Sequence, residues 1–493
     1  MLKQALYEME ADRTTGRMAE EHFRARAMTG YTMFDKIWDQ HVIADLGEGW
    51  SLLHVDRHLL HELTGAGGLD AVSARGLAVS NPELTYATAD HAVSSAPGRT
   101  AATFPVGHKL WADLKRASGD AGIRFFDIGE IGHGILHVAG PELGITLPGL
   151  TLVCGDSHSC THGGLGALAF GIGSSELAHV LATQTLRQRR PQTMRVSFEG
   201  SMASGVTAKD MILHLIARIG AAAGTGYAIE FAGSAVSAMD VEARLTLCNL
   251  SIELGAKFGM VAPDEVTFAY LAGRPYAPSG AAMEEAIRHW RTLASDADAT
   301  FDRIVQIDMS EVVPTITWGT SPEHAIAIDA VIPDPVEAEN DDQGKAWRAA
   351  LDYMGLEAGR TLVGTPVDWV FIGSCANSRL SDLRDAARIV GGRRVAEHVN
   401  AWIVPGSEQV KREAEAEGLD TVFRDAGFDW REPGCAMCVA ANGERVPPGM
   451  RAVSTSNRNF VGRQGPGART HLASPAMAAA AAVTGVITDV RAL

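Results

Sequence analysis

The chain has 493 residues, of which 46% are hydrophobic and 21% are charged, and its formal net charge is −16. This balance is ordinary for a globular protein and excludes a disordered or fibrous chain, while the length predicts two or three packed domains. The negative charge repels phosphate backbones, so a nucleic-acid partner is not expected.

The N-terminal segment, residues 1–32, mixes acidic and basic side chains and has no apolar core. We interpret it as a charged extension with helical character, because a secretory signal requires an apolar centre. The longest alanine-rich run, residues 476–483, is much shorter than the roughly 20 residues that span a bilayer. Six unevenly spaced cysteines are too few for a disulfide scaffold and are typical of a reducing compartment. We therefore expect a cytoplasmic protein without a membrane segment.

Four apolar runs each end abruptly in a loop that is rich in Gly, Ser, Asp, Asn or Pro. They span residues 150–154, 369–372, 401–404 and 451–456. The first two have the uninterrupted apolar character of buried parallel strands, which indicates an α/β fold. Open α/β sheets bind ligands beyond the carboxyl ends of their strands, so functional residues are expected in the loops that follow these runs.

Helices are predicted from their start and stop signals. One begins at residues 174–176 and is expected to continue through the arginines before Pro191, which places acidic and basic side chains at the favourable ends of the helix dipole. Another begins at residues 474–475 and ends at Gly485. The acidic stretch 333–343 lacks apolar periodicity and is interpreted as a linker or exposed loop.

A domain boundary is placed at the acidic stretch. The predicted organisation is an N-terminal extension (1–32), two α/β domains (33–195 and 196–332), a linker (333–345) and a third α/β domain (346–493). The third domain contains a close pair of cysteines, so metal or redox chemistry is expected there.

Three cysteines are candidates for that chemistry. Cys435 and Cys438 form a Cys-x-x-Cys pair, and Cys375 stands at the end of a predicted strand. Such a pair is also compatible with a zinc half-site or a redox pair, although structural zinc normally takes four ligands. A complete iron–sulfur cluster usually takes four cysteines as well. If only three cysteines hold a four-iron cluster, one iron stays open and can polarise a substrate hydroxyl.

Four motifs, taken together and in this order, resemble the aconitase superfamily. They are GDSHSCTHGGLGALAFGIG from Gly155, IGSCANS from Ile372, PGCAMC from Pro433 and STSNRNFVGRQG from Ser454. The resemblance covers about residues 33–493 and is greatest to the large subunits of the members that isomerise isopropylmalate. A single motif of this kind has little specificity, whereas four in order are highly specific.

The resemblance implies a three-domain α/β/α core with one 4Fe–4S cluster at the domain interface. It implies that Cys375, Cys435 and Cys438 bind the cluster and that one iron remains open. Single-chain members carry a fourth, swivelling domain, which is not matched here, so a separate small subunit is expected to supply the catalytic serine base. Cys154 and Cys248 do not match ligand positions and are interpreted as buried hydrophobic residues; the role of Cys160 stays open.

Elimination of water from a hydroxy acid requires one proton to be taken from carbon and another to be given to the departing hydroxyl. Asp90 and His91 form an adjacent pair, in which the carboxylate favours the charged, proton-donating imidazole. By resemblance, the catalytic positions are Asp90, His91, His137, Asp156, His158 and Glu253. The remaining histidines His54, His58, His133 and His162 are interpreted as structural or surface groups.

A dianionic substrate also requires cationic partners, because a guanidinium binds a carboxylate through two parallel hydrogen bonds. Two arginines match carboxylate-binding positions of the family, and four further residues match positions that contact the substrate. By resemblance, the substrate-binding positions are His61, Ser157, Asn249, Asn457, Arg458 and Arg463.

The resemblance implies a hydro-lyase that interconverts 2-isopropylmalate and 3-isopropylmalate through isopropylmaleate in leucine biosynthesis. Three positions depart from the family pattern: Ala92 replaces the Asn of DHN, Ala376 replaces the Thr of SCTNS, and DSHSCTHG replaces DSHTxTHG. These departures leave open a paralogue that acts on citramalate, homoaconitate or another 2-hydroxy acid. Two other classes remain: an RNA-binding regulator, which the acidic charge disfavours, and a structural zinc protein.

Overall fold

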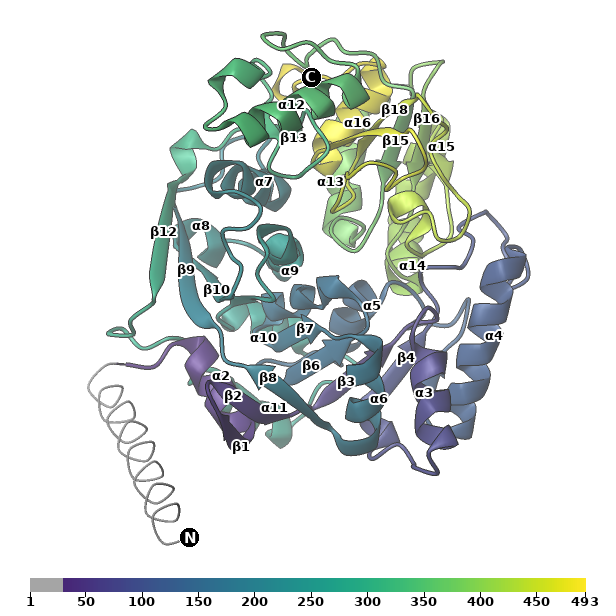
Figure 1. Ribbon diagram of the computed structural model, residues 1–493. Coiled ribbons are helices and arrows are strands. Elements are labelled where there is room, and N and C mark those ends of the chain that lie inside the picture. Colours follow the sequence, from purple (N-terminus) through teal and green to yellow (C-terminus); the bar gives the residue numbers. More distant parts are fainter. Residues whose placement is uncertain (1–29) are drawn as a thin grey trace, which may run out of the picture.

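Two five-stranded parallel sheets position most of the predicted site residues (Figure 1). The first has the order β5-β4-β3-β6-β7 and consists of β3 (Arg57–Leu60), β4 (Thr85–Thr88), β5 (Arg124–Phe126), β6 (Thr151–Cys154) and β7 (Leu168–Gly171). The second has the order β17-β16-β15-β18-β19 and consists of β15 (Trp369–Ile372), β16 (Asn400–Ile403), β17 (Asp429–Trp430), β18 (Arg451–Ser454) and β19 (Arg469–Leu472). Both sheets therefore follow one order: third, second, first, fourth and fifth strand. That order reverses between the first and fourth strands, where open α/β sheets bind ligands.

The computed structural model describes residues 30–493. The predicted N-terminal extension, residues 1–32, therefore lies outside the described residues except for its last three. The three larger sheets pack on clusters of buried hydrophobic side chains, and one of these clusters joins Phe170 of β7 to Phe258 and Met260 of β11 (Phe258–Val261). The α/β fold with parallel sheets is confirmed, whereas the residue boundaries between domains stay predictions.

A third parallel sheet lies between the other two in the sequence. It has the order β11-β10-β9-β12 and consists of β9 (Gln192–Glu199), β10 (Tyr227–Ala232), β11 (Phe258–Val261) and β12 (Arg303–Asp308). Two smaller antiparallel sheets complete the described strands: β1 (Val42–Gly47), β2 (Trp50–His54) and β8 (Thr185–Arg189) form one, and β13 (Thr315–Thr317) and β14 (Ala325–Ala327) form the other.

Helices cover the sheets on both faces, which explains the uninterrupted apolar character of the central strands. In the first half of the chain they are α2 (Met33–His41), α3 (Gly65–Ala74), α4 (Pro105–Asp120), α5 (Leu136–Leu143), α6 (Ser174–Thr183), α7 (Ala208–Ile219), α8 (Ser234–Ser237) and α9 (Val241–Asn249). In the second half they are α10 (Glu265–Leu271), α11 (Ala281–Trp290), α12 (Asp341–Met354), α13 (Leu380–Val390), α14 (Glu408–Ala416), α15 (Leu419–Ala426) and α16 (Pro475–Thr484). Three short 3-10 helices matter for the site: η2 (Ser157–Leu165), η3 (Leu250–Leu254) and η6 (Ala436–Cys438).

The four predicted strands are confirmed as β6, β15, β16 and β18, each in parallel pairing. The helix predicted from residues 474–475 to Gly485 is also confirmed, because Ser474 caps α16 and Gly485 ends it with φ 75°. The other predicted helix was too long. It ends at Thr183, where Gln184 adopts a left-handed conformation, and the arginine-rich continuation forms β8, which pairs with β2.

The predicted linker, residues 333–345, was partly wrong. Asn340 caps helix α12, which begins at Asp341, so the end of the acidic stretch forms the first turn of a helix. The acidic side chains suit that place, because the amino end of a helix carries partial positive charge. None of the helices between residues 30 and 493 has both the length and the apolar character that a membrane span requires.

Candidate active site

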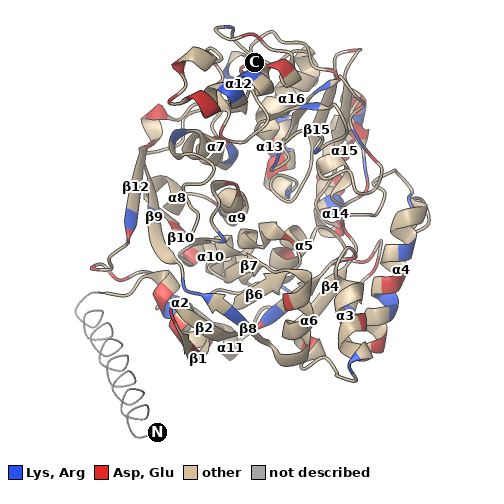
Figure 2. Ribbon diagram, in the orientation of Figure 1, with Lys and Arg blue, Asp and Glu red and all other residues tan. Residues whose placement is uncertain are grey.

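Many charged residues belong to helices at the periphery of the protein, such as α4 and α12 (Figure 2). The buried exceptions include Glu62, Asp90, Lys209 and Arg379, which lie in or against the loops that follow strands of the two five-stranded sheets. A buried charge destabilises a fold unless it is paired or hydrogen-bonded. These residues therefore mark a region in which the fold is organised around polar groups.

The predicted acid pair follows β4. Nδ1 of His91 lies 2.5 Å from Oδ1 of Asp90, and its Nε2 lies 3.2 Å from Oδ2 of Asp156. Burial by itself would lower the pKa of His91, but the two negative carboxylates outweigh it and raise the pKa well above the ordinary value of 6.5. The ring is thus held as a charged imidazolium, the form that can donate a proton.

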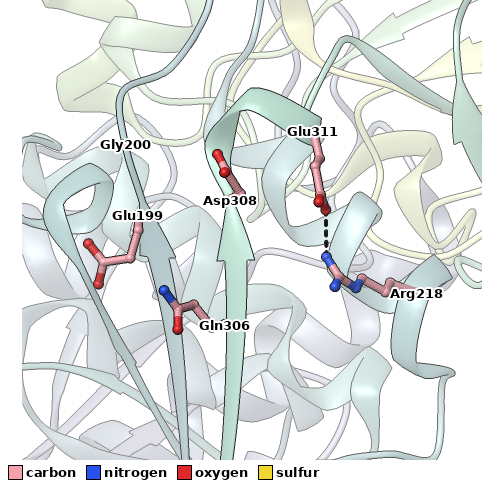
Figure 3. Close-up of a pocket in the computed structure, with 6 residues that line it drawn as sticks. All are labelled: Glu199, Gly200, Arg218, Gln306, Asp308 and Glu311. Atoms are coloured by element: carbon pink, nitrogen blue, oxygen red, sulfur yellow. Dashed lines mark hydrogen bonds and ion pairs between the residues drawn. The ribbon is translucent and has the colours of Figure 1, made fainter.

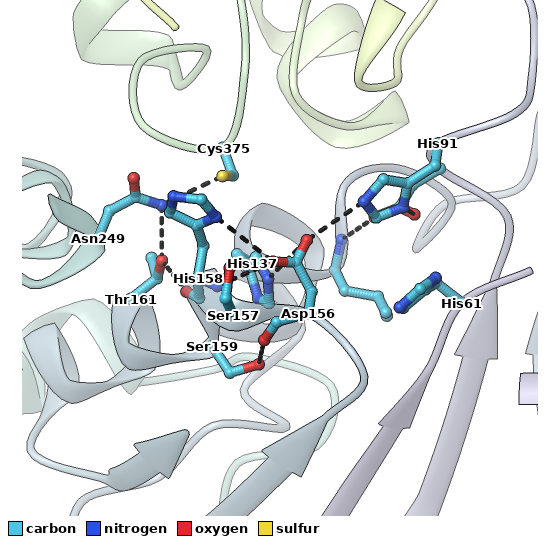
Figure 4. Close-up of polar contacts among 12 residues, drawn as sticks. His61, His91, His137, Asp156, Ser157, His158, Ser159, Thr161, Asn249 and Cys375 are labelled. Carbon is cyan, nitrogen blue, oxygen red and sulfur yellow. Dashed lines mark hydrogen bonds and ion pairs between the residues drawn. The ribbon is translucent and has the colours of Figure 1, made fainter. Parts of the chain in front are cut away.

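Asp156 is the centre of the polar network (Figure 4). It follows β6 and caps η2, because its Oδ1 accepts a hydrogen bond of 2.8 Å from the backbone N–H of His158. Its Oδ2 also lies 3.6 Å from Nε2 of His137. Burial opposes ionisation of Asp156, yet hydrogen bonds from His137, His158 and His91 lower its pKa well below the ordinary value. Asp156 therefore stays ionised among three imidazoles.

The network continues toward the second sheet. Nε2 of His158 lies 2.9 Å from Oε1 of Glu253, and the same oxygen accepts a hydrogen bond of 2.7 Å from Nε of Arg458. Burial would raise the pKa of Glu253, but these two partners lower it below the ordinary value. Glu253 thus connects η2 to the loop that follows β18.

The three predicted cluster ligands lie in loops near the carboxyl ends of strands in the second sheet. Cys375 follows β15, and Cys435 and Cys438 stand at the two ends of the turn that contains η6. All three are buried and none forms a disulfide. Asn457 joins two of them, because its Nδ2 lies 3.2 Å from Sγ of Cys375 and its Oδ1 lies 3.6 Å from Sγ of Cys438.

The donor set fits a soft metal centre. Ser374 (φ 78°) and Ala436 (φ 46°) adopt left-handed conformations directly beside Cys375 and Cys435, so the backbone is strained where it directs two of the thiols. Burial raises the pKa of both thiols above the ordinary value, and a bound metal would favour their thiolate form. Sulfur donors of this kind suit iron–sulfur or zinc chemistry rather than a hard cation.

Two contacts join the thiols to the acid–base network. The backbone N–H of Cys435 donates to the backbone carbonyl of Asp90 at 2.8 Å. Asn249, at the end of α9, donates from Nδ2 to Sγ of Cys375 at 3.1 Å (Figure 4). The structure therefore brings predicted residues from four distant parts of the sequence into one buried region.

Sequence reasoning missed Glu62, which organises the loop of the acid pair. Its buried carboxylate accepts hydrogen bonds from the backbone N–H groups of Asp90 (3.0 Å), His91 (2.7 Å) and Ala92. The neighbouring His61 packs its ring against that of His91, with the centroids 4.6 Å apart, and burial lowers the pKa of His61 to about 4. The available signal was a charged residue inside the apolar run HLLHELT.

Two buried cations were also missed. Nζ of Lys209, on α7, donates to the backbone carbonyls of Thr455 (3.1 Å) and Ser456 (2.6 Å), and burial lowers its pKa to about 8. Arg379 donates from Nη2 to the backbone carbonyls of Cys375 (2.9 Å) and His137 (3.4 Å). Both cations therefore hold backbone segments that carry predicted site residues.

Two predicted substrate contacts lie outside this network. Ser157 is half-buried and lines a cavity of about 480 Å³ together with Ile172, Ile252 and Lys257. The guanidinium of Arg463 lies 5.7 Å from the ring centroid of the exposed Phe460. Within residues 30–493, no hydrogen bond or ion pair joins either side chain to the acid–base groups, so their roles stay predictions.

His162 lies behind the acid–base network. Interpreted from the sequence as a structural or surface group, it is fully buried, and its Nε2 lies 3.0 Å from Nδ1 of His137. The cysteines outside the ligand set, Cys154, Cys160 and Cys248, are buried as well. Sγ of Cys160 lies 3.6 Å from the backbone carbonyl of Asn249.

A second polar hollow lies beyond the carboxyl ends of β9 and β12 (Figure 3). It has a volume of about 450 Å³ and is lined by Glu199, Gly200, Arg218, Gln306, Asp308 and Glu311. Arg218 and Glu311 form an ion pair of 2.7 Å, and each side chain is about half exposed. Exposed pairs of this kind contribute little stability and do not indicate a site.

Comparison with known proteins agrees with the motifs. Residues 35–485 match the model of the family described as "Aconitase family (aconitate hydratase)". The chain is 64% identical over 462 residues to 3-isopropylmalate dehydratase large subunit 1 of Bradyrhizobium diazoefficiens, covering 94% of this chain and 97% of that protein. Among solved structures, the holo-form of Thermococcus kodakaraensis aconitase X matches with a TM-score of 0.43 and 13% identity, covering 83% of this chain and 84% of that one.

Proposed function

This chain belongs to the aconitase family, and we propose that it is the large subunit of a 3-isopropylmalate dehydratase. Such an enzyme is a hydro-lyase of leucine biosynthesis that interconverts 2-isopropylmalate and 3-isopropylmalate through isopropylmaleate. The identity of 64% to a protein of that name, over nearly the full length of both chains, supports the assignment. One structural observation carries it: the loop of Asp90 and His91 is hydrogen-bonded to the loop of Cys435 and Cys438, and Asn457 joins Cys438 to Cys375.

The aconitase family implies a 4Fe–4S cluster. We propose that Cys375, Cys435 and Cys438 hold it and that no protein side chain occupies its fourth iron. When bound, the cluster supplies a Lewis-acidic iron that polarises the substrate hydroxyl. Asn457 would orient two of the sulfur ligands, since its amide already lies between them.

His91 is the proposed general acid. Its ring lies between two carboxylates that favour the imidazolium, and that form can give a proton to the departing hydroxyl. His137 and His158 are proposed to donate hydrogen bonds to the same oxygen, because both border Asp156. Removal of the hydroxyl as water then requires no free solvent proton.

Arg458 and Arg463 are proposed to bind the substrate carboxylates. Nε of Arg458 is held by Glu253, and its terminal Nη groups form no hydrogen bond or ion pair within residues 30–493. Those two nitrogens can therefore form the paired hydrogen bonds that a carboxylate accepts. Ser157, His61 and Asn249 remain proposed contacts to the rest of the substrate.

A small subunit is the proposed partner. The relative with 64% identity is itself named a large subunit, which supports a two-chain enzyme. The proposed partner supplies the serine base that takes the proton from carbon, as the family resemblance implies. The enzyme is then complete only when the two chains assemble.

The test is anaerobic co-expression of this chain with candidate small subunits, followed by iron analysis and assays with several hydroxy acids. We expect about four iron atoms per chain and turnover of 2-isopropylmalate that requires both chains. Full activity of this chain alone would contradict the split site. A preference for citramalate or homoaconitate would replace the proposed substrate, and bound zinc without iron would refute the cluster.

A further inference from the structure

A buried row of three residues lies behind the acid–base network. Nδ1 of His162 lies 2.6 Å from Oγ1 of Thr146, and its Nε2 lies 3.0 Å from Nδ1 of His137. Nε2 of His137 in turn lies 3.6 Å from Oδ2 of Asp156. Thr146, His162 and His137 are each at most 1% exposed. The row therefore runs from a hydroxyl in the interior to the central carboxylate of the proposed site.

The ring of His162 has little freedom to leave this row. It stands against Gly140 on α5, where an added Cβ would come within 3.0 Å of Cε1 of the imidazole. The rings of His162 and His137 meet edge to face, with an interplanar angle of 79° and centroids 5.2 Å apart. A displaced ring would also leave buried polar atoms unpaired. The contacts between the two imidazoles are thus a fixed feature of the fold.

His162 is held in its neutral form. Burial lowers its pKa well below the ordinary value, and the positive charge of Arg379 acts in the same direction, while Asp156 opposes these two effects only in part. A neutral imidazole has one N–H donor and one bare nitrogen. The position of its single proton therefore decides what His162 offers to His137.

The donor count favours one arrangement. If the hydroxyl of Thr146 donates to Nδ1 of His162, the proton of His162 lies on Nε2 and is donated to Nδ1 of His137. The proton of a neutral His137 then lies on Nε2 and faces the ionised Asp156, so every donor in the row has an acceptor.

The reverse arrangement is less favourable. The Thr146 hydroxyl would accept from His162, and no acceptor within residues 30–493 would remain for its own buried proton. His162 would accept from Nδ1 of His137, so a neutral His137 would turn a bare nitrogen toward the carboxylate of Asp156. Both an unpaired donor and two facing lone pairs are unfavourable in a buried site.

We propose that His162 is a positioning residue that keeps the proton of His137 on Nε2, so that the single N–H of His137 points to the side of the ring where Asp156 and the proposed substrate lie. Thr146 supports it by donating to the far side of the ring. The inference rests on the proposed function, because His137 acts there as a donor to the departing hydroxyl. His162, which was interpreted from the sequence as a structural or surface group, would then contribute to the reaction through His137.

Three variants of His162 separate this role from simple packing. His162→Gln keeps an N–H donor near the position of Nε2, His162→Leu has a similar volume but no donor, and His162→Glu places an acceptor there. We expect kcat of the assembled enzyme to fall about 3-fold for Gln, on the order of 30-fold for Leu and more for Glu. KM should stay within about 3-fold of the wild type in all three, because His162 does not touch the substrate.

A packing role predicts the opposite order, since Leu suits a buried cavity better than Gln. Equal or higher kcat for His162→Leu than for His162→Gln would therefore overturn the proposal. Iron content and visible absorption are measured in parallel. If the Leu variant loses its cluster, the Gln and Glu variants decide, and equal kcat in those two would also overturn it.

An activity-independent measurement separates this inference from the proposed function. NMR spectra are recorded of the assembled enzyme labelled with ¹⁵N-histidine, and the signal of His137 is identified as the one that is missing from the His137→Asn variant. This signal should show a protonated Nε2 and a bare Nδ1. His162→Glu should reverse this pattern or protonate both nitrogens. A wild-type enzyme with this signal but no turnover of isopropylmalate would count against the proposed function alone. A bare Nε2 in the wild type would overturn the role of His162.

Discussion

The two five-stranded sheets share one strand order but carry different chemistry. Beyond the first and fourth strands of the first sheet lie His61 and Asp156, an imidazole and a carboxylate. Beyond the matching strands of the second sheet lie Cys375 and Asn457, a thiol and an amide. The topology thus decides where side chains gather, and the residues of the loops decide which reaction that place can support.

The site thus has two halves: a first half, the acid–base groups on the first sheet, and a second half, the thiols on the second sheet. The two halves also differ in the hydrogen-bond partners that their side chains find within the protein. On the first sheet, His91 is at hydrogen-bond distance from two carboxylates. On the second sheet, the thiols of Cys375 and Cys438 contact side-chain amides at 3.1–3.6 Å. Charged hydrogen bonds stabilise a network without a ligand, whereas buried thiols gain strong partners from a metal. The second half should therefore depend on the cofactor and the first half should not.

The largest effect is expected from breaking the second half. Cys435→Ser removes one of three proposed sulfur ligands, so the cluster should be lost and activity should fall by at least about 1000-fold. Iron content, visible absorption and turnover of 2-isopropylmalate measure this. The matched control is Cys154→Ala, which alters a buried cysteine outside the ligand set and should keep its iron. Full iron content in Cys435→Ser would contradict the ligand assignment.

A break in the first half should leave the second intact. His91→Asn keeps a polar side chain but removes the proposed general acid, so kcat should fall on the order of 10²- to 10³-fold. Iron content and absorption should match those of the wild type, because the thiols do not depend on this ring. A variant that loses activity only in proportion to lost iron would show that the two halves are not separable.

The sequence predicted the strands of both halves well and the helices less well. The apolar run of β15 was placed residue for residue, because both faces of a central strand are buried and its pattern is continuous. The basic end assigned to α6 was wrong, because Leu186 and Gln188 alternate with exposed residues and form the edge strand β8. The alternation was too short to outweigh the helix signals that precede it.

The site was predicted through motifs, and its supporting groups were not. The motifs located Asp156 and Cys375, since they are local in sequence. The supporting groups contact backbone or ring atoms that lie far away in the sequence, as Glu62, Lys209 and His162 do. The partner of Glu62 in Asp90 is 28 positions away, and the partner of Lys209 in Ser456 is 247 positions away. A buried charge gives no local pattern, because its partners are created only by the fold.

The pH dependence sharpens the role of charge in the first half. The raised pKa of His91 means that its pairing stabilises the fold fully below the unfolded value of about 6.5 and that this stabilisation is lost as pH rises through the folded value. Activity that requires the imidazolium should follow the same alkaline limit. Asp156→Asn removes one favourable carboxylate, so this limit should move to lower pH by roughly one unit. The pH profile of kcat/KM measures the shift, and an unchanged limit would exclude Asp156 as its cause.

The smallest effect is expected from removing Lys209, a residue outside the second sheet that holds the loop of Asn457 in place. Lys209 extends from α7 and holds the carbonyls of Thr455 and Ser456, which precede Asn457 in the loop that contacts two thiols. Lys209→Met keeps the apolar stem but leaves both buried carbonyls without this donor, so the loop should loosen and the cluster should lose iron about 5-fold faster in the presence of a chelator. Lys345→Met, at an exposed position on α12, is the matched control and should lose iron at the wild-type rate. If the two variants lose iron equally slowly, Lys209 does not stabilise the loop of Asn457, and the thiols are held by the second sheet alone. The thiol part of the site would then depend on the cofactor but not on the third sheet.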